Sequence, residues 1–295
     1  MATIARPEAD RSVRGHPSTL AVVTTEFYKS GRRLRTYVAY GIVALIPIIL
    51  TVVLKTNPPG PPGGRDNGPR FALAYLGTHS GLLIPAFALR ATSEFLLVIV
   101  VALFGGDAIA GEASSGNLRY LLMRPIARGR LFVAKFVVAV LYGWIAVAIV
   151  VLVGAVVGGA VFGFKGLDLP FGFFGGVQSA SHIVGHLAIA TAYVAWFLTT
   201  IVAFSFMVGT MTDSTGGAIL AGIGLWITWT ILDAIDSLGQ VRYFFPPHWS
   251  GAWAEMFTSN HVSDDMIRGS LLTLGYVILF GGIAAWWFRR KDILS

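Results

Sequence analysis

Long runs of apolar residues alternate with short polar connections along the whole chain. Six runs have the length of a membrane span, and they cover residues 37–54, 83–104, 132–153, 187–208, 216–235 and 271–288. A helix needs about 20 apolar residues to cross the hydrocarbon core of a bilayer. The pattern therefore predicts an all-α integral membrane protein with six transmembrane helices.

The composition agrees with a membrane protein. Of the 295 residues, 55% are hydrophobic and only 13% are charged, which is too little charge to cover the surface of a soluble domain. The chain has no cysteine, so disulfides, thiolate catalysis and metal sites with cysteine ligands are excluded. Residues 1–36 are polar and basic, and we expect no removable signal peptide in them.

The basic residues predict how the chain is oriented. Residues 1–36, the connection between the second and third spans, and the C-terminal tail together hold 15 Lys and Arg, against 6 in the connections on the other side. Cytoplasmic loops are enriched in Lys and Arg. We therefore expect a multi-pass protein of the cell membrane with both termini in the cytoplasm. Because the charges flank spans, a nucleic-acid-binding face is disfavoured.

Ahead of the first span, Leu20, Val23 and Phe27 recur at helical spacing, with polar residues opposite. A helix of this kind can lie in the plane of the interface, with its apolar face in the acyl chains. We therefore expect an interfacial helix within the cytoplasmic segment 1–36.

The connection at residues 106–131 is unusually charged for its place between two apolar runs. Within residues 112–124, Leu118, Leu121 and Leu122 share one face of a helix, which Pro125 ends. So short a helix needs a surface on which to bury its leucines. The lipid interface and a groove in a cytoplasmic protein partner are equally good candidates.

The same stretch resembles the signature that follows the second span in ABC-2-type transporter permeases. The residues that carry the resemblance are Asp107, Ile109, Ala110, Glu112, Gly116, Leu118, Leu121, Leu122, Pro125, Ile126, Arg128 and Lys135. Asn117 stands where the family commonly has Thr, which is a mild departure. Glu26 and Lys29, with the arginines before the first span, resemble the family's N-terminal elbow helix, and the six-span layout covers nearly the whole chain.

The resemblance implies that residues 1–295 form one ABC-2-type transmembrane domain, in which residues 106–131 are a coupling-helix loop and residues 236–270 an extracytoplasmic loop. It implies two cytoplasmic ATP-binding subunits, which bind the ATP and Mg²⁺, and a second permease copy or paralogue. The implied contacts with the ATP-binding subunit are Asp107, Glu112, Gly116, Leu118, Arg119, Leu121, Leu122, Pro125 and Arg128. Of these, Asp107 and Glu112 are expected to fix the elbow between the second span and the coupling helix by pairing with Arg119, Arg128 or Lys135.

Two charges fall inside the second span. Arg90 and Glu94 are four residues apart and hence on one helical face. Ionisable residues at membrane depth usually face a cavity or a partner, so the pair is a candidate lining of a transport pathway. The alternative is that the span starts later and leaves both residues among the outer headgroups.

Residues 241–257, between the fifth and sixth spans, combine aromatic residues with two prolines and predict a short, broken structure at the interface. This structure is either an interfacial anchor or a re-entrant element that lines a gate.

Motifs for phosphate binding, nucleophilic catalysis and metal binding are absent from the sequence or incomplete. No phosphate-binding loop and no nucleophile elbow occur. His182 and His186 have the spacing of two zinc ligands but lack a third ligand nearby. We therefore expect no catalytic residue, metal or cofactor on this chain itself.

Taken together, the sequence predicts the permease subunit of an ATP-driven transporter, which is no enzyme by itself and acts through the helix at residues 112–124. Export of an amphiphilic small molecule is the favoured activity. The alternatives are a secondary transporter or channel that works without ATP and, less favoured, an intramembrane enzyme.

Overall fold

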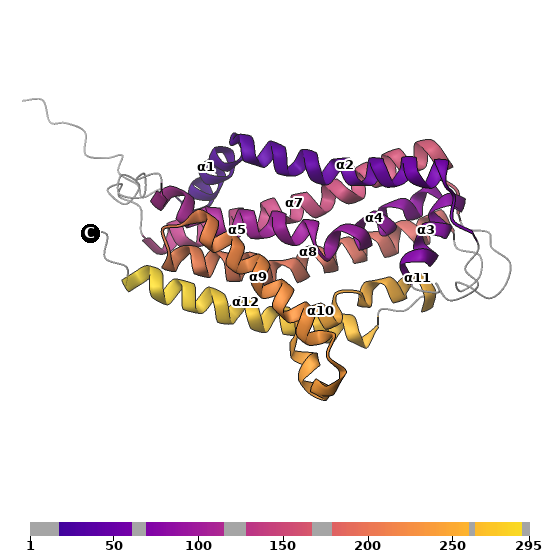
Figure 1. Ribbon diagram of the computed structural model, residues 1–295. Coiled ribbons are helices and arrows are strands. Elements are labelled where there is room, and N and C mark those ends of the chain that lie inside the picture. The colour runs from indigo at the N-terminus through magenta and orange to yellow at the C-terminus, as the bar shows by residue number, and fades with distance from the viewer. Residues whose placement is uncertain (1–17, 61–68, 115–127, 167–178, 260–262, 291–295) are drawn as a thin grey trace, which may run out of the picture.

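The computed structural model describes residues 18–60, 69–114, 128–166, 179–259 and 263–290. These parts of the chain form helices and no strand. Six of the helices are long and apolar enough to cross a membrane: α2 (Leu34–Thr56), α5 (Leu96–Ser114), α7 (Arg128–Phe162), α8 (Ala180–Met211), α9 (Thr215–Asp233) and α12 (Asp264–Arg290). They run roughly along one direction (Figure 1). The predicted number of spans is confirmed, and the chain is a multi-pass membrane protein.

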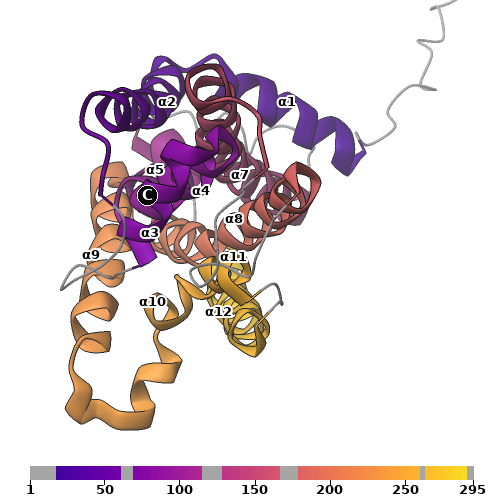
Figure 2. The ribbon, with the colours of Figure 1, turned by 90° about the vertical axis from the view of Figure 1, so that its right-hand side faces the viewer.

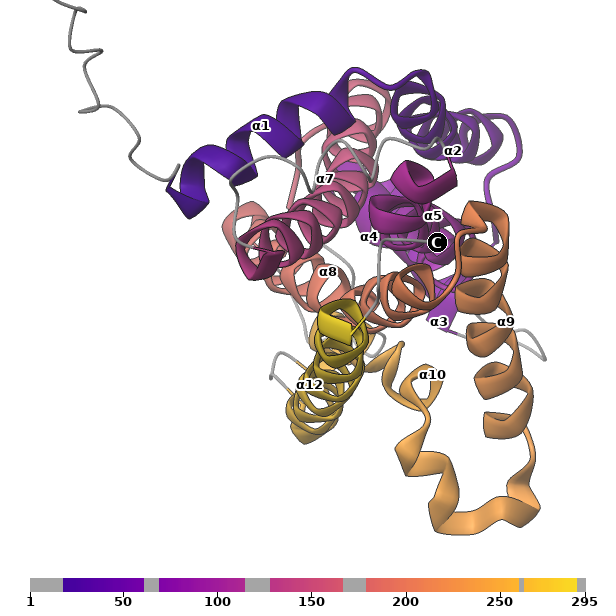
Figure 3. The ribbon, with the colours of Figure 1, turned by 90° about the vertical axis from the view of Figure 1, so that its left-hand side faces the viewer.

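Helices α5 and α8 form the centre of the bundle. In their most apolar windows 61% and 67% of the residues are buried, compared with 28% for α2 and 22% each for α9 and α12. Helix α5 packs against α7, α8 and α9, while α12 packs mainly on α8 and α2 mainly on α7. The views along the bundle in Figures 2 and 3 show α2, α9 and α12 at its periphery. The peripheral helices therefore leave much of their apolar surface exposed.

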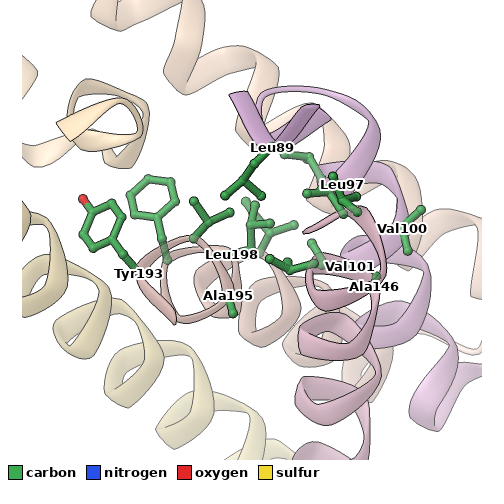
Figure 4. Packing of buried hydrophobic residues seen from close by; sticks show 14 of the residues in the cluster. Leu89, Leu97, Val100, Val101, Ala146, Tyr193, Ala195 and Leu198 are labelled. Atoms are coloured by element: carbon green, nitrogen blue, oxygen red, sulfur yellow. The ribbon is translucent and has the colours of Figure 1, made fainter. Parts of the chain in front are cut away.

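The buried core contains almost only aliphatic and aromatic side chains. Figure 4 shows Leu97 and Val101 of α5 beside Ala146 of α7, Leu198 of α8 and Leu89 of α4 (Ile84–Ser93). In a bilayer the lipid tails are as apolar as these side chains, so close packing rather than the hydrophobic effect holds the helices together. The shapes of the contact surfaces therefore decide which helices are neighbours.

Glycines allow the closest of these contacts. A Cβ atom on Gly105 would lie 2.5 Å from the carbonyl oxygen of Val202 in α8, and one on Gly106 would lie 2.9 Å from the backbone nitrogen of Ile219 in α9. Gly158 of α7 meets the backbone of Gly81 in the same way. Small residues at helix contacts let backbones approach closely.

The second span differs from its prediction. It is not one helix over residues 83–104, but the short 3₁₀ turn η1 (Gly81–Leu83), then α4, a break at Glu94 and Phe95, and then α5. The Thr92 hydroxyl donates to the carbonyl of Ala88 (2.8 Å), which competes with the helical pattern just before the break. At the break, the Trp226 indole of α9 donates to the Glu94 carbonyl (2.7 Å). Neighbouring helices can satisfy such groups within a membrane protein.

Two predicted loop boundaries are also wrong. Helix α5 continues to Ser114, so residues 106–114 are helical, and the loop expected at 106–131 can begin only after Ser114 and end before Arg128, where α7 starts. The expected outer loop 236–270 ends earlier, because α12 begins at Asp264. Asp264 and Asp265 in its first turn favour that start, since carboxylates stabilise a helix N-terminus.

Residues 236–259 form a chain of short helices between α9 and α12, as their prolines and aromatic residues predict. The elements are η2 (Asp236–Phe244), α10 (Pro246–Trp249), η3 (Ala252–Glu255) and α11 (Met256–Ser259). Element η2 projects from the bundle (Figure 2). Trp253, by contrast, is fully buried, and η3 packs against α8 and α12. The second half of this segment is therefore part of the core.

Before the first span, α1 (Thr19–Gly31) is a separate helix that packs on α7. Helix α3 (Pro69–His79) lies at the opposite end, beside α4. Arg33, Arg128 and Arg290 mark the end of the bundle at which α1 lies, which we call the basic end. Figure 1 shows this end on the left.

The glycine contacts generate a test. Gly105→Ala should destabilise the protein by about 1–3 kcal/mol, because the added methyl group overpacks the contact with Val202. The midpoint of thermal unfolding, followed by tryptophan fluorescence in detergent, should fall. The matched variant Gly224→Ala on α9 has open space around the new methyl group, and its midpoint should stay equal or rise, since alanine favours helix. Equal effects of the two substitutions would contradict the packing argument.

Candidate functional site

Four cations and three carboxylates meet at the basic end of the bundle. They are Glu26 and Lys29 of α1, Arg33 and Arg35 at the start of α2, Asp107 and Glu112 of α5, and Lys135 of α7. We call this cluster the charged joint. It connects α1 and three of the six spans, so its geometry fixes how these helices lie relative to one another.

Glu112 is the centre of the charged joint. Its side chain is only 1% exposed, and its carboxylate accepts from the Nζ atoms of Lys29 (2.5 Å) and Lys135 (2.7 Å). Lys135 is itself 3% exposed and also donates to Glu26 (2.9 Å). A buried charge costs several kcal/mol unless a partner compensates it, and here Glu112 lies between Lys135, which is also buried, and Lys29, which is 39% exposed.

Asp107 extends the cluster toward the first span. It accepts from Arg33 (2.5 Å) and from Arg35. The second terminal nitrogen of Arg33 lies 3.9 Å from Glu112 and so connects the two carboxylates. A side chain at Gly111, one turn further along α5, would collide with the Asp107 carboxylate. Carboxylates and cations therefore alternate from α1 to α2, which is the arrangement that keeps like charges apart.

The turn between α1 and α2 positions Arg33 and Arg35. Helix α1 ends at Gly31, and the chain turns at once into α2, whose N-cap is Arg33. The carbonyl of Ser30 accepts from the amide of Arg33 (3.3 Å) and from the hydroxyl of Thr36 (2.9 Å), which closes the corner. The turn between α1 and α2 thus places Arg33 and Arg35, at the start of α2, next to the carboxylates of α5.

Aromatic side chains lie directly beneath the charges. The Tyr142 hydroxyl donates to the carbonyl of Phe27 (2.7 Å), and the Tyr40 hydroxyl donates to the carbonyl of Tyr142 (3.0 Å). The ring of Phe104 lies 5.4 Å from that of Tyr142 and 5.6 Å from that of Tyr40. A Cβ atom on Gly31 would lie 2.6 Å from the Tyr142 hydroxyl, so this contact requires glycine.

The cavity within the charged joint has a volume of only about 30 Å³. Pockets that bind small molecules usually have volumes of about 300–1,000 Å³. The cluster is therefore a mechanical connection between helices rather than a pocket for a substrate or cofactor.

The described residues include only some of those predicted to contact an ATP-binding subunit. Asp107 and Glu112 lie in the charged joint, and the contact of Glu112 with Lys135 is one of the expected pairings. Asp107 pairs instead with Arg33 and Arg35, which the sequence indicated only as topology signals. Arg128 is exposed at the first position of α7. Gly116, Leu118, Arg119, Leu121, Leu122 and Pro125 lie outside the described residues.

Sequence reasoning missed how α1 joins the cluster. Glu26 and Lys29 were noted for a family resemblance, without the partners that the fold provides. A signal was present: Glu26 falls four residues after Val22, on the face of α1 that is buried against α7. An acidic residue within an apolar stripe requires a buried cation, and Lys135 supplies it.

Arg90 and Glu94 form a second charged position, at the break between α4 and α5. Their side chains pair with each other and are 16% and 31% exposed. Arg90 lies six residues after Ile84, which packs near Leu54 at the far end of α2; at 1.5 Å per residue this is about 9 Å into the bundle. Its guanidinium reaches toward Gly251, before η3. The pair therefore lies among packed helices, and its place in a transport pathway stays a prediction.

The remaining predicted candidates show no site chemistry. Asp233 contacts His248 (2.8 Å) and Arg242 (3.5 Å), in a cluster where α9 meets the connection to α12. His182 and His186 face each other with ring centroids 6.3 Å apart. Among the described residues no three His, Cys, Asp or Glu side chains gather as they would around a metal ion.

Comparison with known proteins gives a family and two similar proteins. The model of a family described as "Protein of unknown function (DUF2705)" matches residues 44–294. A "Probable ABC transporter permease protein NosY" of Stutzerimonas stutzeri is 31% identical over 176 residues, which cover 54% of this chain and 56% of that protein. A protein of the same name from Pseudomonas aeruginosa is 29% identical over 171 residues, 55% of each chain. The chain thus spans about half the length of the curated relatives that it matches.

The burial of the charged joint generates a stability test. Lys135→Met should destabilise the protein by about 3–5 kcal/mol, the usual cost of leaving a buried charge without its partner, because Glu26 then loses the lysine that it contacts. Unfolding of the purified protein by dodecyl sulfate in mixed micelles measures the change.

Two further variants control this test. Adding Glu26→Gln to Lys135→Met should recover part of the lost stability, since one uncompensated carboxylate disappears. Lys55→Met removes an exposed lysine at the far end of α2 and should have almost no effect. If both lysine variants were equally stable, the charged joint would not hold the helices together.

Proposed function

The chain belongs to the family described as proteins of unknown function (DUF2705), and we propose that it is the permease subunit of an ABC transporter. Two similar proteins are named as probable ABC transporter permeases, and six helices of the described residues can cross a membrane. As a permease, the chain would be a transport subunit of the complex and would not itself catalyse a reaction.

The position of the charged joint carries the proposal. Residues 115–127 connect α5 to α7, and the joint holds both of their attachment points. Glu112 lies three residues before this segment and Lys135 eight residues after it, and the two side chains contact each other and α1. A force applied to the segment would therefore act on α1, α5 and α7 together. This is what a permease needs in order to convert closure of an ATP-binding subunit into movement of its spans.

On this proposal, the coupling helix is the part of residues 112–124 that follows the end of α5 at Ser114, with Arg128 at its far side. Leu118, Leu121 and Leu122 bury their side chains in a cleft of the ATP-binding subunit, Gly116, Arg119 and Pro125 shape the segment, and Asp107 and Glu112 hold its base. Helix α1 is then the interfacial elbow helix. Two cytoplasmic ATP-binding subunits bind the ATP and Mg²⁺, and a second permease copy or paralogue completes the pathway.

The proposed orientation follows the basic residues. The basic end of the bundle lies in the cytoplasm with both termini, and η2 to α11 lie toward the outside of the cell membrane. Charged residues at this end include Arg33, Arg128, Arg130, Arg289 and Arg290, and Lys and Arg concentrate in cytoplasmic loops.

We further propose export of an amphiphilic small molecule past Arg90 and Glu94. Both side chains lie at a break in the second span, next to Trp226 and Gly251. Broken helices and ionisable residues at membrane depth are features of transport pathways. An ion pair surrounded by apolar and aromatic side chains suits a substrate with one polar group on an apolar body.

The coupling proposal is tested by co-expression with an ABC ATP-binding subunit encoded beside the gene. Leu121→Asp with Leu122→Asp should weaken the complex by at least about tenfold, since burial of one leucine side chain contributes about 1.5–3 kcal/mol. Copurification measures the complex, and ATP hydrolysis in proteoliposomes measures its activity.

The matched control is Ser114→Asp, which places one new carboxylate on an exposed side chain just before the segment. It should assemble and hydrolyse ATP like the unchanged protein. Normal assembly and hydrolysis in the double aspartate variant would contradict the coupling proposal and would favour a secondary transporter or channel that works without ATP.

The pathway proposal has a separate test. Arg90→Gln should reduce the stimulation of ATP hydrolysis by amphiphilic substrates by about tenfold, because losing a hydrogen bond to a charged group costs about 1.5–3 kcal/mol. Basal hydrolysis and assembly should stay the same.

Arg268→Gln controls this variant, because it removes the same charge from a side chain that is 66% exposed on α12. It should leave the stimulation unchanged. Unchanged stimulation in Arg90→Gln itself would place the Arg90–Glu94 pair outside the pathway and leave the coupling proposal intact.

A further inference from the structure

Element η2 exposes apolar side chains although it belongs to a folded segment. None of its residues, Asp236–Phe244, is buried. Val241, Tyr243 and Phe244 are 51%, 52% and 65% exposed. The backbone reverses at Gly239, whose φ of 53° favours glycine over residues with a side chain. The element therefore forms a tip that presents apolar and aromatic surface outward.

The tip projects from the side of the bundle and not from its end. In Figure 1 the spans run across the picture, and the segment between α9 and α10 extends downward beside α12. Figure 2, which looks along the bundle, shows the same segment at the bottom, away from the other helices. A loop beyond the end of a span would extend into water, whereas a sideways projection extends along the membrane.

A contact with α12 gives the depth of η2. The Tyr276 hydroxyl donates to the Phe244 carbonyl (2.9 Å). Tyr276 follows Arg268, which is 66% exposed, by eight residues, or about 12 Å along the helix. An exposed arginine near the end of a span keeps its charge among the headgroups, and the headgroup region is about 5–8 Å thick on each side of a bilayer. The Phe244 backbone therefore lies about 5 Å inside the hydrocarbon boundary, a usual depth for interfacial elements.

The charged side chains of η2 have their partners within the same part of the chain. Arg242 contacts Asp236 (2.5 Å) and Asp233 (3.5 Å), and His248 also contacts Asp233 (2.8 Å). The tip therefore does not need a charged partner. Asp236 is 93% exposed, and charged residues are depleted from the centres of protein interfaces. A hydrated headgroup layer suits this carboxylate better than a contact with a second copy of the chain.

The exposed surface of η2 continues that of the two spans that it connects. Ile231 of α9 is 60% exposed, and Ile235, directly before η2, is 41% exposed. On α12, Leu274 and Ile278, on either side of Tyr276, are 43% and 65% exposed. In a multi-pass membrane protein such faces contact acyl chains. The same lipid layer therefore reaches the apolar side chains of η2.

We propose that η2 is an interfacial anchor that inserts into the leaflet at the end of the bundle opposite the basic end. Val241, Tyr243 and Phe244 contact acyl chains, and Asp236 lies among hydrated headgroups. Tyrosine concentrates at membrane–water interfaces. Of the two structures that the sequence left open for this segment, the anchor is thus assigned to η2. The proposal depends only on the membrane location of the chain and is independent of transport.

Spin labels on the full chain test the proposal. Because the chain has no cysteine, Val241→Cys and Phe244→Cys each provide a single labelling site. In phosphatidylcholine nanodiscs, electron paramagnetic resonance measures collisions of the label with oxygen and with chromium oxalate. The ratio of oxygen to chromium oxalate collisions should be at least about threefold higher at both positions than in water, because a charged complex avoids hydrocarbon.

Two further labels give the reference values. Asn57→Cys lies on an exposed residue just after α2, at the same end of the bundle, and should show the ratio of water. Ile227→Cys lies on a half-exposed residue within α9 and should show the ratio of the acyl region. Equal midpoints of thermal unfolding show that the labelled variants are folded.

Other environments of η2 give different results. If the labels at Val241 and Phe244 showed the same ratio as the label at Asn57, η2 would lie in water. If both labels were shielded from both reagents and broadened each other's spectra between chains, a second copy would cover η2. Either result would overturn the proposal.

A second measurement needs no substitution. A lipid-soluble carbene precursor labels side chains in the acyl region of the unchanged protein on illumination, and peptide mass spectrometry locates the label. Residues 241–244 should be labelled to within about threefold of residues 227–231 of α9, because both stretches expose apolar side chains to the same lipid. Labelling of 227–231 without labelling of 241–244 would contradict the proposal, even if every cysteine variant were unstable.

Discussion

The alternation of carboxylates and cations in the charged joint is the constraint on which the rest of the structure depends. Glu112 and Lys135 are almost completely buried and contact each other, and a buried charge is costly unless a partner compensates it. The further charges of the cluster come from α1, from the start of α2 and from α5, so the electrostatic requirement of one residue fixes the position of several elements. The corner between α1 and α2, the end of α5 and the start of α7 have to meet at one place because these charges have to meet.

The charged joint and the glycine contacts act on the same central helices. Gly105 and Gly106 bring α5 against α8 and α9, and directly beyond them Asp107 and Glu112 attach α5 to α1, α2 and α7. Helix α5 is therefore held on all sides, while α2, α9 and α12 leave most of their surface exposed. Their exposed apolar faces are available to lipid.

The two charged positions of the protein lie on one continuous part of the chain. Helix α5 begins after the break at Glu94 and ends next to residues 115–127. If the chain is a permease, movement of that segment would reach the Arg90–Glu94 pair through one rigid helix that packing protects along its length. At the break, the Glu94 carbonyl accepts from the indole of Trp226 in α9.

The sequence by itself determined the membrane class and the number of spans, and through a family resemblance it pointed to Asp107 and Glu112. Apolar length is a local property that a bilayer imposes on any helix, and a carboxylate next to an apolar run requires a partner wherever the chain folds. The tertiary structure determines which cations pair with Asp107 and Glu112. Arg33 and Arg35 are more than 70 residues from Asp107, and only the packing of α1 and α2 on α5 and α7 brings them together. The break in the second span was also a tertiary feature, because the indole of Trp226, which donates to the Glu94 carbonyl there, comes from a different helix.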